Sequence, residues 1–223
     1  MTKQNNKITV IDYGMGNLFN VIRAFEAIGC DVRATNNINE IQKAERLLLP
    51  GVGAFEDGIK DLRDNNLDNA IIEFVSTGRP LLGICLGMQL LMTVSEENGY
   101  HEGLNLIRGR VIRFEEPTKL SNGYKIPQIG WNNLRRPKKS KDLSLKDIWD
   151  NTILNGFSND PYVYFLHSYF VTPKDEKIIL SETNYGQDIF CSIFQQNQIV
   201  GCQFHPERSG ESGLSILRNF MKL

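Results

Sequence analysis

Residues 79–91 read RPLLGICLGMQLL, and this stretch decides both the fold class and the candidate chemistry of the chain. An apolar run typical of a buried strand ends at Gly83, and a helical pattern begins after Cys85. Gly83 and Gly87 flank Cys85 in the order glycine, any residue, nucleophile, any residue, glycine, which is the pattern of a nucleophile elbow. Side chains at the two glycines would clash where strand and helix pass closely. The stretch therefore predicts a thiol that stands clear of a sheet edge.

Strand-like and helix-like patterns alternate around this elbow in the first half of the chain. The runs KITVIDY, DVRAT and ERLLLP are typical of strands, and apolar residues recur at helical spacing between Leu18 and Ile28. Strict alternation indicates a parallel sheet with helices on both faces. From about residue 105 strands follow one another, as LIRGRVIRF, YVYFLHSYF, KIILSET, FCSIFQ and QIVGCQFH, before a helix at 213–223. We therefore expect a three-layer α/β fold whose central sheet is mixed and mostly parallel.

Length and composition narrow the class of protein. The 223 residues contain no repeat or dividing linker, so we expect a single domain, 1–223, that buries roughly 70% of its surface. A formal net charge of −1 gives no global attraction to nucleic acid, and no apolar run approaches the ~20 residues of a membrane span. The N-terminal residues lack the order of a signal peptide, which predicts a cytoplasmic protein.

The cysteines, histidines and glycine-rich loops give no sign of a metal or cofactor. The four cysteines form no CxxC pair, so reduced thiols are expected, and the three histidines lack paired-ligand spacing. The loop GMGNLF at 14–19 carries Phe19 where a dinucleotide loop needs its third glycine. The polar, basic segment 132–147 is interpreted as a solvated surface loop, with contact to a partner or a phosphate as the alternative.

Cys85 has two features that favour a reactive thiolate. It lies at the start of the helical pattern through Met88 and Leu91, where the positive end of the helix dipole favours an anion. The backbone N–H of Leu86 points to the same space and can hold a developing oxyanion. The alternative is a small buried hydrophobic residue, which is how we interpret the other three cysteines.

A base and an orienting acid stand together in VGCQFHPE. His205 and Glu207 are two residues apart, so in an extended chain their side chains share one side, and Pro206 stiffens the spacing. A carboxylate there would hold the imidazole in its useful tautomer. The alternative is a structural histidine near a surface glutamate. His101 is assigned to a polar loop, and His167 to the wall of the site.

The segment LLLPGVGAF supplies a third element. Pro50 ends a strand, and Gly51, Val52 and Gly53 form a turn whose backbone amides can aim at an oxyanion. Glycine-rich turns after parallel strands also bind phosphate, so this element alone leaves both interpretations open.

Together these motifs resemble the class I, triad-type glutamine amidotransferases. Within that family the sequence resembles the glutaminase subunits of imidazole glycerol phosphate synthases of histidine biosynthesis. The similarity runs in order along almost the whole chain, in IDYGMGN, LPGVGAFEDG, GICLGMQLL, SEENG, GLNLIRGRV, IGWN, YFLHSY, QFHPERS and GLSILRNF. The resemblance implies an enzyme without cofactor that releases ammonia from L-glutamine.

Roles for individual residues follow from the resemblance alone. It implies that Cys85 attacks the side-chain amide of glutamine, that His205 passes its proton to the departing ammonia, and that Glu207 orients His205. The oxyanion hole would use Leu86 and the Gly51–Val52–Gly53 turn, which in this family can reorient. Positions that hold the ends of the glutamine are Gln89, Glu97, Ser168 and Tyr169.

The resemblance also implies a partner. Ammonia would pass into a separate (β/α)8-barrel cyclase subunit, in a heterodimer that makes imidazole glycerol phosphate and AICAR. Asn17, Trp131 and Tyr164 match positions near that interface. The family usually writes PHMGWN where residues 127–132 read PQIGWN, so that Gln128 and Ile129 depart from it close to the expected partner surface.

Three alternatives to this function stay open on the sequence. A paralogous amidotransferase would supply ammonia for amidine formation on a surface sugar. A stand-alone γ-glutamyl or other cysteine hydrolase would share the fold and act at full rate without a partner. A non-catalytic binding module would keep the fold without activity, but the presence of Cys85, His205 and Glu207 speaks against it.

Overall fold

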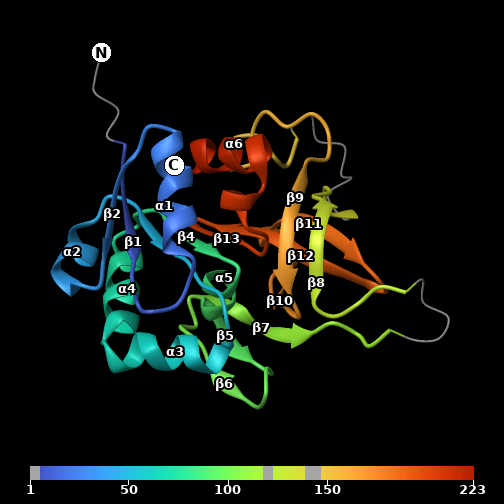
Figure 1. Cartoon of the computed structure of the whole chain (residues 1–223), viewed down its shortest axis with the longest axis horizontal. Coiled ribbons are helices and arrows are strands. Elements are labelled where there is room, and N and C mark those ends of the chain that lie inside the picture. The colour runs from blue at the N-terminus through green and yellow to red at the C-terminus, as the bar shows by residue number, and fades with distance from the viewer. Residues whose placement is uncertain (1–5, 118–122, 139–146) are drawn as a thin grey trace.

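The computed structural model describes residues 6–117, 123–138 and 147–223. Its main sheet has seven strands in the order β11–β12–β13–β4–β3–β1–β2 (Figure 1). The parallel strands are β1 (Lys7–Ile11), β2 (Asp31–Thr35), β3 (Leu47–Leu49), β4 (Leu81–Ile84) and β13 (Ile199–Cys202). The antiparallel edge is formed by β12 (Asp188–Gln196) and β11 (Ile179–Tyr185). The prediction of a mixed, mostly parallel sheet is confirmed.

Helices cover both faces of this sheet because its strands are apolar on both sides. The helices are α1 (Leu18–Ala27), α2 (Ile38–Lys43), α3 (Phe55–Asp64), α4 (Leu67–Ser76), α5 (Leu86–Leu90) and α6 (Gly210–Phe220). Val10 and Leu48 pack into one core with α1 and α6, whereas Ile11 and Leu49 pack into a second core with α3 and α4. Successive strand residues alternate between the faces, and the three-layer architecture follows from that alternation.

Two smaller sheets stand beside the main one. One has the order β10–β7–β5–β6 and is built from β5 (Met92–Ser95), β6 (His101–Glu102), β7 (Ile107–Arg113) and β10 (Tyr169–Pro173). The other pairs β8 (Gln128–Asn133) with β9 (Tyr162–His167) in antiparallel register. The run 162–170, which the sequence indicates as one strand, is therefore two strands in different sheets. The strict alternation of buried residues in β9, which includes Phe165 and His167, ends at Ser168, and β10 buries the adjacent residues Phe170 and Val171.

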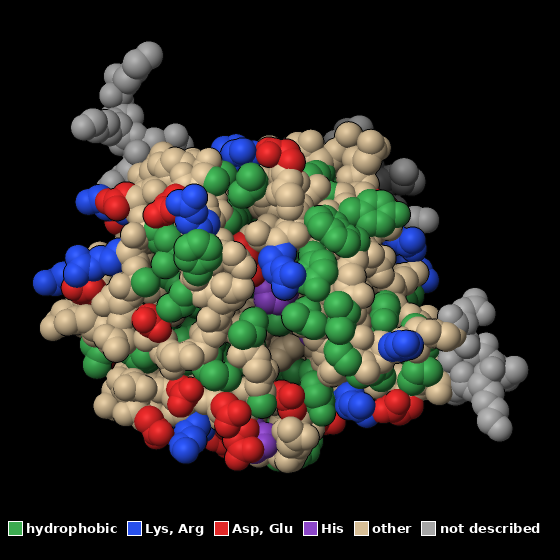
Figure 2. Space-filling view, in the orientation of Figure 1, with side chains coloured by type: hydrophobic (Ala, Val, Ile, Leu, Met, Phe, Trp, Pro, Cys, Tyr) green, Lys and Arg blue, Asp and Glu red, His purple; other side chains and the backbone are tan. Residues whose placement is uncertain are grey.

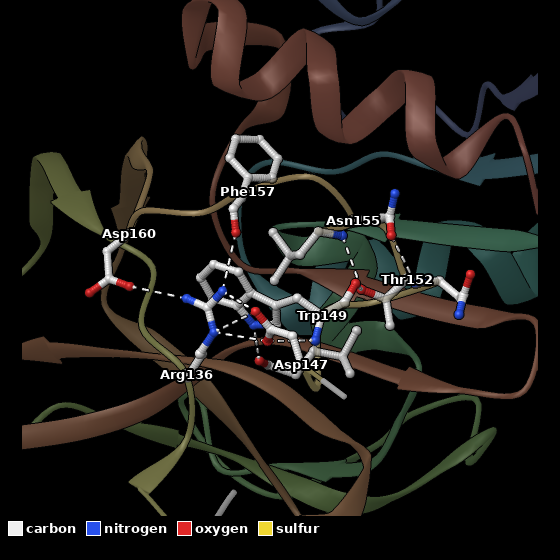
Figure 3. A network of polar contacts seen from close by, with 10 residues as sticks. Arg136, Asp147, Trp149, Thr152, Asn155, Phe157 and Asp160 are labelled. Atoms are coloured by element: carbon white, nitrogen blue, oxygen red, sulfur yellow. Dashed lines mark hydrogen bonds and ion pairs between the residues drawn. The ribbon is translucent and has the colours of Figure 1, made fainter. Parts of the chain in front are cut away.

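The segment 132–147 is not the simple surface loop that its composition suggests. Asn132 and Asn133 belong to β8, and the guanidinium of Arg136 lies 3.7 Å from the centre of the Trp149 ring (Figure 3). Arg136 Nε donates to Asp147 Oδ1 at 2.9 Å, and its Nη2 donates to the carbonyl of Phe157 at 3.1 Å. This cation therefore anchors the chain around Trp149. Residues 139–146 of the segment lie outside the described residues.

The described residues, 6–117, 123–138 and 147–223, contain neither a membrane-spanning helix nor a grouping of metal ligands. No helix in those parts of the chain is both long enough and apolar enough to cross a membrane. Within the same ranges, no three side chains of His, Cys, Asp or Glu are grouped so that they could hold a metal ion.

Candidate active site

Cys85 occupies a sharp turn between β4 and α5. Its φ of 53° lies in the left-handed region, which side chains with a Cβ adopt only under strain. A Cβ added at Gly83 would come within 2.9 Å of the backbone nitrogen of Met88, and one at Gly87 would overlap the carbonyl oxygen of Leu49. The elbow therefore requires both glycines. The helix after it is short, since α5 covers only Leu86–Leu90.

His205 reaches the elbow because β13 lies parallel to β4. Cys202 pairs with Ile84 in this register, and the backbone N–H of Cys85 donates to the carbonyl of Cys202 at 2.7 Å. The strand ends at Cys202, and the backbone N–H of His205 donates to the carbonyl of Tyr164 on β9 at 2.9 Å. Both candidate residues therefore lie at the carboxyl edge of adjacent parallel strands, where sites of open α/β sheets form.

Glu207 approaches His205 by a different route from the one expected. The chain does not stay extended, because η3 (Pro206–Arg208) is a 3-10 turn in which the N–H of Arg208 donates to the carbonyl of His205 at 3.0 Å. The prediction of an extended His–Pro–Glu segment is therefore wrong. The turn still brings the carboxylate to the ring, with His205 Nδ1 2.7 Å from Glu207 Oε1.

The environment of His205 favours the imidazolium. Only 5% of its side chain and 2% of the Glu207 side chain are exposed. Burial lowers the pKa of His205, but the negative charges of Cys85 and Glu207 outweigh it and raise the pKa to about 10. Its Nε2 forms no hydrogen bond of ordinary geometry within the described residues, although Cys85 is close enough to act on it electrostatically. The arrangement suits a thiolate–imidazolium pair.

The glycine turn after β3 packs directly on the elbow. Tyr13 Oη donates to the carbonyl of Pro50 at 2.7 Å, and a Cβ added at Gly51 would come within 2.9 Å of the Leu86 Cβ. Gly51 is therefore a close-approach position, while Val52 and Gly53 line the cavity above Cys85. Of the three residues expected to form the oxyanion turn, two reach the cavity and one supports it.

A cavity of about 260 Å³ opens above Cys85. All four residues expected to contact glutamine line it, and the full lining is Val52, Gly53, Cys85, Leu86, Gln89, Glu97, Pro127, Leu166, His167, Ser168 and Tyr169. Gln89 Nε2 donates to the carbonyl of Tyr169 at 2.9 Å, and Glu97 Oε2 accepts from the backbone N–H of Phe55 at 2.8 Å. Burial raises the pKa of the Glu97 carboxyl. The thiol of Cys85 and the polar side chains of Gln89 and Glu97 thus face the same cavity.

His167 forms part of the cavity wall and is held neutral. Its Nδ1–H donates to the carbonyl of Tyr169 at 2.8 Å, and its ring packs against Phe114, Phe165 and Phe190. Burial lowers the pKa of His167 to about 3. The sequence interpretation of this residue as wall and not base agrees with that environment.

The residues expected at a partner interface lie in two different settings. Trp131 and Tyr164 stand opposite each other across β8 and β9 with ring centres 6.2 Å apart, and Trp131 is 55% exposed. Ile129 lies on the same face at 61% exposure, and Figure 2 shows hydrophobic side chains gathered over this pair of strands. Asn17 instead caps α1 by accepting from the N–H of Asn20 at 3.3 Å.

Gln128 does not face the surface as its position in the motif suggested. It is 2% exposed and stands opposite His167 on the inner side of the β8–β9 pair. Neighbouring strand residues point to opposite faces. The departure from the family pattern that reaches the surface is therefore Ile129.

Sequence reasoning missed two polar residues that support the site. Gln203 is fully buried, and its Nε2 lies 3.8 Å from Cys85 Sγ. Ser209 Oγ donates to the carbonyl of His205 at 2.6 Å and accepts from the N–H of Tyr164 at 2.9 Å. The available signal was a glutamine inside the otherwise apolar run that precedes His205, since a buried polar side chain needs a partner.

Comparison with known proteins shows the fold and the family of this chain. The family model for class-I glutamine amidotransferases matches residues 9–223. Among solved structures, PurLQS from Thermotoga maritima aligns with a TM-score of 0.71 at 16% identity over 98% of both chains. A second structure, described as a glutamine amidotransferase, aligns with a TM-score of 0.70 at 14% identity over 96% of this chain and 97% of the other. These structures establish the fold, and with the family match the chain is a class-I glutamine amidotransferase.

Sequence relatives narrow the family further. Imidazole glycerol phosphate synthase subunit HisH 1 of Legionella pneumophila (strain Paris) is 41% identical over 98% of this chain and 100% of its own length. The HisH subunit of Geobacillus kaustophilus is 44% identical over 96% of this chain and 95% of its own. The HisH subunit of Aquifex aeolicus is 43% identical over 97% and 96%. The chain belongs to the HisH family of imidazole glycerol phosphate synthase subunits.

Proposed function

We propose that this chain is the glutaminase subunit of an imidazole glycerol phosphate synthase. It hydrolyses L-glutamine to glutamate and ammonia, and the ammonia passes to a (β/α)8-barrel cyclase that makes imidazole glycerol phosphate and AICAR. The observation that carries the proposal is the buried pair of His205 and Glu207, 2.7 Å apart, beside a thiol that opens on a cavity of about 260 Å³. The HisH relatives support the choice of pathway.

In the first half of the reaction a thioester forms. Cys85 Sγ attacks the side-chain amide carbon of glutamine, and the electron pair of the C=O bond moves onto oxygen. Backbone N–H groups of Leu86 and of the turn at Val52 and Gly53 stabilise this oxyanion. As the C–N bond breaks, His205 gives its proton to the departing nitrogen, which leaves as ammonia. A histidine that Glu207 keeps protonated is suited to this step.

In the second half water replaces the thiolate. Neutral His205 takes a proton from a water molecule, whose oxygen attacks the thioester carbonyl through the same oxyanion hole. The C–S bond breaks, glutamate leaves, and the proton on His205 restores the starting ion pair with Cys85. Glu207 holds the ring through Nδ1 in both halves, which keeps Nε2 directed at the reacting atoms.

The polar lining of the cavity suggests how glutamine is held. Both amide hydrogens of Gln89 are engaged, on the carbonyl of Tyr169 at 2.9 Å and on Gln203 Oε1 at 3.3 Å. Gln89 therefore offers its oxygen, an acceptor suited to the α-ammonium of the substrate. Glu97 is a second acceptor for the ammonium, which would relieve the cost of its burial. The α-carboxylate is assigned to the backbone of Ser168 and Tyr169.

The apolar outer face of β8–β9 is the surface we assign to the cyclase. Ile129, Trp131 and Tyr162 are each more than half exposed on this face, and Arg208 stacks on Tyr164 at 4.5 Å beside the His205 turn. Exposed aromatic residues of this kind mark protein interfaces. We place the heterodimer in the cytoplasm, where all four cysteines stay as free thiols.

Glutamate release tests the proposal. It should be slow for the chain alone and rise strongly when the cognate cyclase and the cyclase's ligand are added. Cys85→Ala should abolish glutamate release but leave the complex able to make product from free ammonium. Constant full activity without a partner would indicate a stand-alone hydrolase. Stimulation only by a cyclase that forms amidines on sugars would assign the chain to the paralogous pathway.

A further inference from the structure

A chain of side-chain amides connects Cys85 to the glutamine end of the cavity. Gln203 follows β13 directly, and its backbone N–H donates to the carbonyl of Ser192 at 3.0 Å. Its side chain lies between two partners: Nε2 is 3.8 Å from Cys85 Sγ, and Oε1 accepts from Gln89 Nε2 at 3.3 Å. Gln89 Nε2 also donates to the carbonyl of Tyr169 at 2.9 Å. The contacts of Gln203 with Gln89 and with Cys85 are both buried.

The direction of this amide chain is fixed by its last member. A backbone carbonyl only accepts, so the group of Gln89 that faces Tyr169 is the NH2. The second hydrogen of that NH2 then points to Gln203, which answers with its oxygen. Gln203 is left with its own NH2 directed at Cys85 Sγ. Rotating the Gln203 amide by half a turn would place its NH2 against the NH2 of Gln89, so that two donors would meet. The same rotation would place Oε1 against the sulfur, where it would meet a second acceptor if Cys85 is a thiolate and only a weak donor if it is a thiol.

We propose that Gln203 stabilises the thiolate of Cys85 through this N–H donor, with Gln89 locking the amide in the required orientation. The proposal deepens the glutaminase function and rests on it. A hydrogen bond to the charged form of a group favours that form, and it does so more strongly where water is excluded. Helix α5 (Leu86–Leu90) is short, so a side-chain donor can add to the stabilisation of the thiolate that its N-terminus provides. Gln203 acts on the sulfur itself.

Other titratable groups around Cys85 are His205, with Glu207 behind it on η3, and Tyr13 beside the glycine turn; Glu97 and His167 line the same cavity. The Tyr13 hydroxyl donates to the carbonyl of Pro50, so it does not compete for the sulfur as a donor. Substituting Gln203 leaves all five groups in place. A change in thiol reactivity then reports on the amide and not on the imidazolium.

The pH dependence of alkylation measures this effect on the full chain. The rate of iodoacetamide labelling at Cys85 is followed against pH, with the labelled peptide identified by mass spectrometry. Gln203→Met keeps the length of the side chain without its N–H, and the midpoint of the profile should rise by about one pH unit, a roughly tenfold lower rate on the acid side. Gln203→Glu should raise it further, because an ionised carboxylate only accepts and repels the thiolate.

A matched control and a second variant keep the test decisive. Gln195→Met removes an amide of the same kind from β12, away from the cavity, and should leave the profile unchanged. If Gln203→Met fails to fold in thermal unfolding, Gln89→Met releases the lock on Gln203 and should still shift the midpoint upward. A Gln203→Met or Gln89→Met profile that coincides with the natural one would overturn the proposal. If Cys85 of the natural protein is labelled no faster than the half-buried Cys30, that result would instead contradict the glutaminase function itself.

Discussion

Replacing Glu207 by glutamine removes one charge from a buried pair and changes little else. Glu207 Oε1 accepts from His205 Nδ1 at 2.7 Å, and an amide oxygen at the same place can still accept that hydrogen. The imidazolium then loses its carboxylate partner in surroundings where the two side chains are 5% and 2% exposed. The variant should therefore keep the ring oriented but weaken its positive state and, with it, proton delivery to the leaving ammonia.

The size of the loss has two bounds. A hydrogen bond to a charged group contributes about 1.5 kcal/mol at the low end. Two unit charges about 4 Å apart interact by roughly 4 kcal/mol at an effective dielectric constant of 20. This value is the upper bound on the loss, because the charges of the imidazolium and the carboxylate are delocalised and interact less strongly than point charges. If the transition state feels the full difference, kcat should fall between about tenfold and a thousandfold.

The assay is glutamate release by the complex with the cyclase and its ligand at saturating glutamine. Glu211→Gln serves as the control, since Glu211 is an exposed carboxylate paired with Arg218 on α6, and its removal should leave kcat unchanged. Thermal unfolding of both variants separates loss of activity from loss of fold. A Glu207→Gln enzyme whose kcat stays within a factor of about two would refute the assigned role of the carboxylate.

Three further predictions concern the elbow, the cavity wall and the ring of contacts around Trp149. Gly87→Ala should lower the free energy of unfolding by about 3 kcal/mol or more in urea titration, because its Cβ would overlap a backbone oxygen. His167 has a folded-state pKa of about 3, against about 6.5 unfolded, so the unfolded chain binds the extra proton between these values. The free energy of unfolding should therefore fall by about 3 kcal/mol through this residue as the pH is lowered from 6.5 to 4.5. The His167→Phe variant should lose less stability over the same range. Arg136→Met should cost about 1–2 kcal/mol in the same titration and leave glutamate release unchanged.

The parallel half of the fold follows from local sequence patterns, and the late strands do not. Runs such as KITVIDY carry apolar residues on both faces, so their place inside a covered parallel sheet is readable. The break at Ser168 is a different kind of event. The residues on either side both look like strand, and only the pairing of β9 with β8 and of β10 with β7 separates them. Strand partners depend on tertiary contacts that alternation alone does not encode.

The same division applies to the site. Glycines around Cys85 and the His–Pro–Glu segment carry strong local signals, because tight backbone approach and proton transfer each demand particular residue types. Gln203 carries only a weak local signal, a polar side chain inside an apolar run, because its role depends on a 3.8 Å contact with a residue 118 positions away. Gln128 was misplaced for a related reason: motif similarity gives its position in the chain, but strand register decides that it faces His167 and not the surface.

The central claim is that Cys85 forms the covalent intermediate. Glutamine is mixed with the complex of chain, cyclase and cyclase ligand, the reaction is quenched in acid within its first turnovers, and the Cys85 peptide is examined by mass spectrometry. We expect one glutamyl group on that peptide in the natural protein, and neither the adduct nor glutamate release in Cys85→Ala. Undiminished glutamate release by the complex carrying Cys85→Ala would contradict the account.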